Sequence, residues 1–424
     1  MGAIGNILAP VKIPRGVIVR QHFANEKISA ENLPAHIRGE LRNQNLLEQI
    51  RPNQRVGITA GSRGIANIAL VIRELSTIVR EAGAVPYVIP CMGSHGGASA
   101  EGQIEILSKL GITEEYIGAS ILSSMEVVCL GKSKSGVPVY VDKNAWEMDS
   151  LIIINRIKPH TAFRGAVESG LQKMLVIGVG KQKGAETCHN AGFGEMYQNI
   201  TEMSNLILEK MNISFAIGLV ENAYDETFLC VALPKHQIKK KEPELLEVAK
   251  ARLPKIPFRE LDVLVIDEIG KNIAGSGMDT NVTGRYATPY ITGGPRISKI
   301  VTLDLTDESK GNATGLGHSD FTTRRCVDKM NFEATYPNAL TSTVTTPSKI
   351  PLVMPNDILA VKAGIMTCNS KTLEQVKLVR IRNTLKLEQI WISEGLIQSA
   401  QQNSTLEIMS DLEEMAFDAN GNLF

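Results

Sequence analysis

The stretch "RVGITAGSRGIANIALVIRELSTIVREAGAVPYVIP", residues 55–90, decides the fold class of the chain. It predicts a strand ("RVGITA"), a glycine turn ("GSRG"), an amphipathic helix over about 65–82 and a second strand ("AVPYVIP"). A second glycine turn ("CMGSHGGAS") and a helix over about 99–110 follow. Strands that alternate with helices form βαβ units around a parallel sheet, which binds its ligands at the carboxyl ends of its strands. The two glycine turns, which hold Arg63 and His95, therefore lie where a ligand is expected.

The same alternation continues and then starts again after a charged helix. Candidate strands follow at 125–130, 136–141 and 150–155, and the last of them leads to His160. The charged segment "HQIKKKEPELLEVAKARLPKIPFRE" has two prolines near its end, and the next stretch, "LDVLVIDEIG", opens a new α/β alternation. The sequence therefore predicts two α/β domains with mainly parallel sheets and an active-site cleft between them.

The domain junction is expected at about residue 256. The first domain, 1–255, is expected to hold the cofactor and the catalytic residues, and the second, 256–403, to close the cleft. The acidic C-terminal segment, 404–424, is expected to return to the first domain.

The composition excludes several classes of protein. The chain has 424 residues, of which 43% are hydrophobic and 21% charged, the balance of an ordinary globular protein. Its 45 basic residues match 45 acidic ones and only 5% are aromatic, so it lacks the charge and stacking surface of a nucleic-acid binder. No apolar run approaches a membrane span, and no signal-like leader is seen, so we expect a cytoplasmic protein without membrane contact. Its six cysteines form no CxxC pair, which argues against a zinc ribbon, an iron–sulfur cluster or a disulfide framework.

The densest chemistry lies in "IKPHTAFRGAVESGLQKMLVIGVGKQKGAETCH", residues 157–189. Its "GVGK" is not a phosphate-binding P-loop, because that motif requires Ser or Thr after the lysine, and Gln182 stands there. Taken singly, its glycines and lysines also fit ordinary turns and solvated side chains. Together with Arg63 and His95, however, the stretch collects several groups in loops that follow strands.

These groups allow more than one chemistry. Two histidines on opposite sides of a substrate can act as general acid and base, as a racemase or epimerase requires, and Arg63 can hold a carboxylate bidentately. Three histidines, His95, His160 and His189, can instead hold zinc with an open position. Lys173, between a glycine and an apolar run, can become a nucleophile through desolvation.

Five motifs in order resemble the nickel-pincer lactate racemases and their 2-hydroxyacid racemase relatives. They are "GSRGI" (61–65), "GSHGG" (93–97), "KPH" (158–160), "GLQKMLVIGVG" (170–180) and His189, which follows Lys173 by sixteen positions. The resemblance implies an isomerase, a racemase or epimerase of a 2-hydroxyacid. It also implies a nickel cofactor, pyridinium-3,5-bisthiocarboxylic acid mononucleotide (the nickel-pincer nucleotide), and hence the enzymes of cofactor biosynthesis as partners.

The resemblance also assigns residues to roles. Lys173 would tether the cofactor, with Arg63, Gly170 and Gly178 in its binding site, and His189 would be the protein ligand of nickel. His95 and His160 would deprotonate and reprotonate the substrate hydroxyl while hydride moves to the cofactor and back through a 2-keto acid. Arg63 would orient the substrate carboxylate or a nearby cofactor group. In the second domain, Asn281 and Arg285 of "GSGMDTNVTGR" (275–285) would contact the substrate.

The chain departs from the family pattern at several places. Ala60 and Gly64 stand where the family has an aspartate and a proline, and Gly96 follows His95 where an arginine is common. These positions lie where the substrate would be recognised, so we expect a 2-hydroxyacid other than lactate as readily as lactate itself. Two other functions remain open from the residues: a cofactor-free racemase with His95 and His160 as its two bases, and a non-catalytic nucleotide- or cofactor-binding protein of the same fold.

Overall fold

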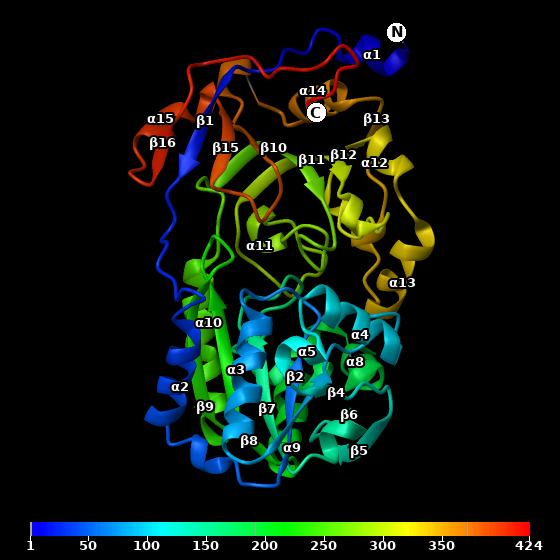
Figure 1. Ribbon diagram of the computed structural model, residues 1–424. Coiled ribbons are helices and arrows are strands. Elements are labelled where there is room, and N and C mark those ends of the chain that lie inside the picture. The colour runs from blue at the N-terminus through cyan, green and yellow to red at the C-terminus, as the bar shows by residue number, and fades with distance from the viewer. Residues whose placement is uncertain (1, 191, 371) are drawn as a thin grey trace. The chain divides into compact units, whose positions relative to one another are not determined.

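The computed structural model describes residues 2–190, 192–370 and 372–424, and it divides the chain into two compact units (Figure 1). One unit, Ala24–Leu253, is continuous and is called the insert unit. The other consists of the segment that ends at Phe23 and the segment Pro254–Phe424, and is called the split unit. The chain is therefore an α/β protein in which one unit is inserted into the other.

The insert unit is built on a six-stranded sheet in the order β4-β3-β2-β7-β8-β9. All neighbouring strands are parallel except β8 and β9. The strands are β2 (Arg55–Ala60), β3 (Val85–Pro90), β4 (Ser120–Ile121), β7 (Ser150–Arg156), β8 (Ile213–Glu221) and β9 (Thr227–Pro234). A separate antiparallel pair is formed by β5 (Val127–Lys132) and β6 (Pro138–Asp142), which correspond to two of the candidate strands but do not join the main sheet.

Helices cover both faces of this sheet. They are α2 (Leu33–Asn43), α3 (Ile68–Glu81), α4 (Ala100–Lys109), α5 (Glu114–Ile117), α6 (Lys143–Trp146), α7 (Leu171–Lys173), a π-helical turn (Met174–Gly178), α8 (Lys181–Asn190), α9 (Met196–Lys210) and α10 (Ile238–Arg252). Alternate residues of β7 enter different cores: Leu151 and Ile153 pack with α9, and Ile152 and Ile154 pack with α3. A strand buried on both faces reads as a continuous apolar run, which explains "LIII" in the sequence.

The split unit holds an eight-stranded sheet in the order β13-β12-β11-β10-β14-β15-β1-β16. Its first five strands are mutually parallel, and β15, β1 and β16 extend it by antiparallel pairing. The strands are β1 (Gly16–Gln21), β10 (Glu260–Ile269), β11 (Arg296–Leu305), β12 (Phe321–Thr323), β13 (Leu352–Met354), β14 (Leu378–Ile381), β15 (Gln389–Ser393) and β16 (Leu406–Ile408). Its helices are α1 (Ala3–Leu8), α11 (Thr280–Thr283), α12 (Arg324–Asp328), α13 (Phe332–Ser342), α14 (Asp357–Thr367) and α15 (Ile397–Gln401).

Two chain segments lie in a different unit from the one expected. Residues up to Phe23 were expected in the first domain, but β1 pairs with β15 and β16 and so belongs to the split unit. Residues 404–424 were expected to return to the first domain, but β16 and the Gly16–Glu413 bridge keep them in the split unit. The physical reason is the same in both cases. The backbone groups of β1 form hydrogen bonds with β15 on one side and with β16 on the other, which places both segments in the split unit. The cleft between the domains stays a prediction.

None of the helices in the described parts of the chain is both long and apolar enough to cross a membrane.

Candidate functional site

Three neighbouring strands of the insert unit bring Arg63, His95 and His160 to one edge of its sheet. β3, β2 and β7 are adjacent and parallel, so the loops that follow them leave from the same edge. Arg63 follows β2, His95 follows β3 and His160 follows β7. Ser62 and His95 are joined by a hydrogen bond between the serine Oγ and the ring Nδ1, which connects the first two loops. The sequence placed these three residues at this edge, and the structure has them there.

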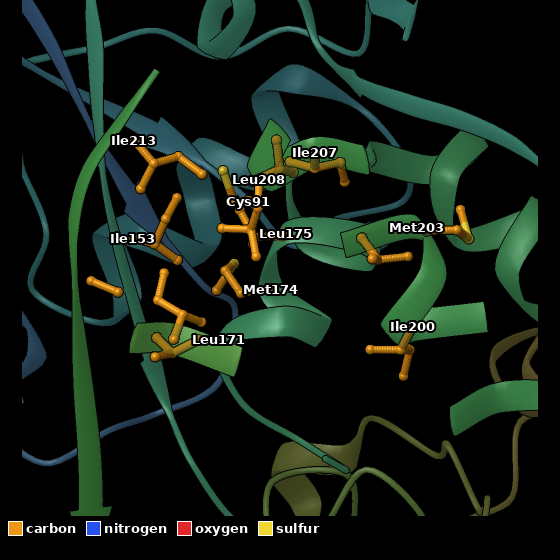
Figure 2. Packing of buried hydrophobic residues seen from close by; sticks show 14 of the residues in the cluster. Cys91, Ile153, Leu171, Met174, Leu175, Ile200, Met203, Ile207, Leu208 and Ile213 are labelled. Atoms are coloured by element: carbon orange, nitrogen blue, oxygen red, sulfur yellow. The ribbon is translucent and has the colours of Figure 1, made fainter. Parts of the chain in front are cut away.

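Lys173 reaches the same site from an irregular helical segment. It ends α7 and is followed at once by the π-helical turn Met174–Gly178, a rare conformation that is frequent at functional sites. Leu171, Met174 and Leu175 anchor the segment in the apolar cluster shown in Figure 2. Burial, aided by the positive charge of Arg63, lowers the pKa of Lys173 to about 8. A lysine in this state supplies a neutral amine close to physiological pH, as covalent attachment of a ligand requires.

His189 has one ring nitrogen held by the backbone of its own helix. Its Nδ1 lies 2.7 Å from the carbonyl oxygen of Ala185, one turn earlier in α8. Because a carbonyl only accepts, we assign the ring proton to Nδ1, which leaves the lone pair on Nε2. Burial and the nearby charge of Lys173 lower the pKa of His189, which keeps the ring neutral. Metal-binding histidines commonly make such a bond to a backbone carbonyl with the nitrogen that does not bind the metal.

His160 has the opposite tautomer. The backbone N–H of Ala162 donates to His160 Nδ1 at 3.1 Å, so a neutral ring carries its proton on Nε2. The His160 ring lies against Phe163, with 4.5 Å between the ring centroids. Burial, followed by the charges of Lys173, His189, Lys158 and Arg164, lowers the pKa of His160 well below its ordinary value. His160 is therefore a neutral imidazole that presents an N–H.

The site is rich in positive charge. The charges of Arg63 and Lys158 lower the pKa of Lys173, and the charge of Arg156 lowers the pKa of Arg63. Desolvation and the Arg156 charge lower the pKa of Arg63, although the residue is exposed. Arg156 itself forms an ion pair with Glu221. Mutual repulsion among these cations favours an anionic ligand, such as a carboxylate or a phosphate.

Gly170 and Gly178, the two glycines predicted in the cofactor site, each have a packing reason to be glycine. A Cβ on Gly170 would collide with the carboxylate of Glu242. A Cβ on Gly178 would collide with the sulfur of Met174 and approach the Cys91 carbonyl oxygen to 2.8 Å. These contacts let the Lys173 segment lie against its neighbours, and a direct role in cofactor binding stays a prediction.

The donor set fits a metal that brings most of its own ligands. Within the described parts of the chain, no three His, Cys, Asp or Glu residues gather as a metal site, so the three-histidine zinc alternative lacks its ligands. A single imidazole, that of His189, is suited to a metal whose other donors come from an organic cofactor. Square-planar Ni(II) with soft donors is such a metal. The residues present therefore fit the nickel-pincer nucleotide.

Asn281 and Arg285 lie in the split unit and have local partners there. Asn281 Nδ2 donates to Asp279 Oδ1 at 2.8 Å, and the Asp279 side chain also caps α11. Arg285 forms an ion pair with Asp320 at 3.2 Å and donates to the carbonyl oxygen of Ile297 at 3.1 Å. These contacts hold the 275–285 loop, and the substrate-binding role of both residues stays a prediction.

Two acidic residues near the site were missed from the sequence. Glu168, which is buried, accepts a hydrogen bond from the His160 backbone N–H at 2.7 Å and pairs with Arg164 and Lys250. Glu242, also buried, accepts from the backbone N–H of Gln172 at 3.1 Å, next to Lys173. Glu168 had a signal, because it is an acid within a basic, glycine-rich stretch. Glu242 had none, because it lies in a charged helix that reads as solvated.

Comparison with known proteins relates part of the chain, including most of the insert unit, to one family. Residues 6–201 match the model of the lactate racemase N-terminal domain, and the matched range includes Arg63, His95, His160, Lys173 and His189. The structure of the lactate racemase apoprotein from Thermoanaerobacterium thermosaccharolyticum is similar to this chain, with a TM-score of 0.52 and 13% sequence identity. The alignment covers 81% of this chain and 88% of that chain, which shows a shared fold. No curated protein sequence matches the chain. Residues 6–201 are therefore similar to the lactate racemase N-terminal domain.

Proposed function

We propose that the chain is a racemase or epimerase of a 2-hydroxyacid that uses a nickel-pincer nucleotide tethered to Lys173. The observation that carries the proposal is the state of Lys173, a lysine whose pKa burial and Arg63 lower to about 8. It lies within electrostatic reach of a histidine prepared as a metal ligand and of a second, neutral histidine. A surface lysine or a simple anion-binding lysine would need neither property.

The residues of the insert unit would divide the binding of the cofactor among them. The Lys173 amine would form the covalent bond, and His189 Nε2 would donate to nickel while its Nδ1–H stays on the Ala185 carbonyl. When bound, such a cofactor supplies reversible acceptance of hydride from the substrate carbon. The positive charges of Arg63 and Lys158 would balance the anionic groups of the cofactor and the substrate carboxylate.

The two remaining histidines would move the hydroxyl proton. His160 holds a proton on Nε2 in its resting state, so it would donate to the substrate oxygen. His95 would present the lone pair of Nε2 if its Nδ1–H donates to Ser62 Oγ, and it would then accept the hydroxyl proton. The opposite enantiomer would require the two histidines to exchange these roles. A site that serves both enantiomers needs such a pair of groups, each able to hold the proton.

The test is intact mass and nickel content of the protein produced together with the enzymes of pincer-cofactor biosynthesis. Wild-type protein should carry a mononucleotide adduct and about one nickel ion, and Lys173→Ala should carry neither. Lys183→Ala, which removes an exposed lysine of the same stretch, should load like wild type. His189→Ala should keep the adduct and lose the nickel, because the covalent bond and the metal bond use different residues.

The alternatives give different results. An unmodified wild-type chain without nickel would contradict the proposal. If that chain still racemised a 2-hydroxyacid in D₂O with deuterium entering C2, the cofactor-free two-base racemase would be correct, since a transferred hydride does not exchange with solvent. The non-catalytic binding protein would bind a nucleotide or cofactor stoichiometrically without turnover, and neither His95→Ala nor His160→Ala would change that binding.

A further inference from the structure

Lys181 is a lysine to which the proposed chemistry assigns no role. It is 0% exposed and stands at the first position of α8. Its backbone φ is +54°, in the left-handed region where a side chain is strained. Such a conformation persists only where the surrounding contacts over-determine it, and glycine would adopt it without strain. The contacts of the lysine side chain must therefore offset this strain.

Three acceptors surround the ammonium group of Lys181. Its Nζ lies 2.5 Å from the carbonyl oxygen of Pro90, 2.9 Å from Gln103 Oε1 and 3.0 Å from Asp142 Oδ2. The first two contacts are hydrogen bonds, and the third is an ion pair with the Asp142 carboxylate. Asp142 is also 0% exposed, and each member of a buried ion pair depends on the other for its charge. Lys181 therefore joins the end of β3, helix α4 and the end of β6 at one point.

Gln103 extends this contact to the His95 loop. Because the lysine only donates, Gln103 must turn its Oε1 toward Lys181 and its Nε2 the other way. That Nε2 donates to the carbonyl oxygens of Gly93, at 3.0 Å, and His95, at 3.3 Å. The loop has positive φ at Gly93, Gly96 and Gly97, so its own sequence restrains it weakly.

The same point is tied to the segment that carries the other site residues. Lys181 begins helix α8, which carries His189, and the backbone N–H of Asp142 donates to the carbonyl of Val179 at 2.7 Å, just after the π-helical turn. The contacts thus run from α8 through Lys181 and Gln103 to the backbone of His95. We propose that Lys181 and Gln103 are positioning residues that hold the His95 loop at a fixed place relative to helix α8. The inference rests on the proposed function only in giving His95 a part in turnover.

The variant that isolates this role is Gln103→Glu. It keeps an oxygen for Lys181 but replaces the amide donor with a second oxygen, which faces the carbonyls of Gly93 and His95. Glu101→Gln, an exposed change on the same helix, is the matched control. Hydrogen exchange of the apo protein, followed by mass spectrometry, should show residues 92–98 exchanging about tenfold faster in Gln103→Glu. Residues 182–190 should be unchanged, and Glu101→Gln should match wild type at both segments.

Turnover supplies the second readout. In protein loaded with the cofactor, Gln103→Glu should lower kcat by about a hundredfold through misplacement of His95, while the covalent adduct and the nickel content stay at the wild-type level. Unchanged exchange of residues 92–98 in Gln103→Glu would overturn the inference, whatever the activity. A wild-type protein without adduct would contradict the proposed function but leave the exchange result valid. Lys181→Met should loosen both segments, and if it does not fold, Gln103→Glu decides alone.

Discussion

Lys173 should be the most reactive amine of the apo protein near neutral pH. Burial and the Arg63 charge lower its pKa from 10.5 to about 8. At pH 7 an amine with a pKa of about 8 is about 9% uncharged, whereas one at 10.5 is about 0.03% uncharged, a difference of about 300-fold. Since only the uncharged amine is a nucleophile, the labelling rate of Lys173 should exceed that of a solvated lysine by a large part of this factor.

Competitive labelling with trace acetic anhydride between pH 6 and pH 11 measures this directly. The rate for the peptide with Lys173 is compared with that of Lys183, an exposed lysine of the same stretch. Lys173 should titrate with a midpoint near 8, and Arg63→Gln should move that midpoint upward, because a repelling cation is lost. A wild-type midpoint near 10.5 would refute the desolvation argument. An unchanged midpoint in Arg63→Gln would remove Arg63 from the explanation.

Three further predictions concern stability, each measured by urea unfolding. Burial raises the pKa of Glu242 to about 7 from 4.5, so the unfolded chain loses this proton first and stability should fall as the pH rises from about 4.5 to 7; Glu242→Gln should flatten this dependence and recover up to about 3 kcal/mol at pH 8. Arg325→Met should cost about 3–5 kcal/mol, because Asp357, which is 0% exposed and accepts from Arg325 at 3.0 Å, would keep a buried charge without its cationic partner. The control is the exposed ion pair of Arg296 and Glu260, where Arg296→Met should cost less than about 1 kcal/mol. Gly178→Ala should cost about 1–3 kcal/mol through overpacking against Met174 and Cys91, whereas Gly64→Ala, with nothing within 4 Å of the added carbon, should be near neutral. Equal costs for the members of either pair would contradict the packing and burial arguments.

Local patterns predicted the insert unit well. The strands and helix expected at 55–90 are β2, α3 and β3, because an apolar face recurs with the period of each element. The edge that carries Arg63, His95 and His160 also followed from the sequence, since parallel strands leave their loops at one edge. Lys173 and His189 were candidates from the residues, and their roles as cofactor tether and nickel ligand came from the resemblance. Their chemical states needed the structure, because desolvation and tautomers depend on neighbours that are distant in sequence.

Long-range pairing was beyond the local signals. β1 pairs with residues 389–393 and 406–408, and nothing within 16–21 specifies which sheet it joins. The sequence presents Lys181 only as part of "GVGK", and nothing local in it indicates the contacts with Pro90, Gln103 and Asp142. The sequence alone does not distinguish a buried lysine from a solvated one, because burial depends on tertiary contacts.

The place of β1 also fixes an order of events during synthesis. A ribosome makes residues 16–21 before the insert unit, and it makes their partner strands at 389–393 and 406–408 only after the insert unit. Every residue of the insert unit is made in between, so the six strands of its main sheet can pair while β1 is still unpaired. An unpaired strand exposes backbone N–H and C=O groups that can pair with the sheet edge of another chain. The nascent chain therefore exposes β1 without its partners while the insert unit is made, and a chaperone that shields β1 during this interval should raise the yield of native protein.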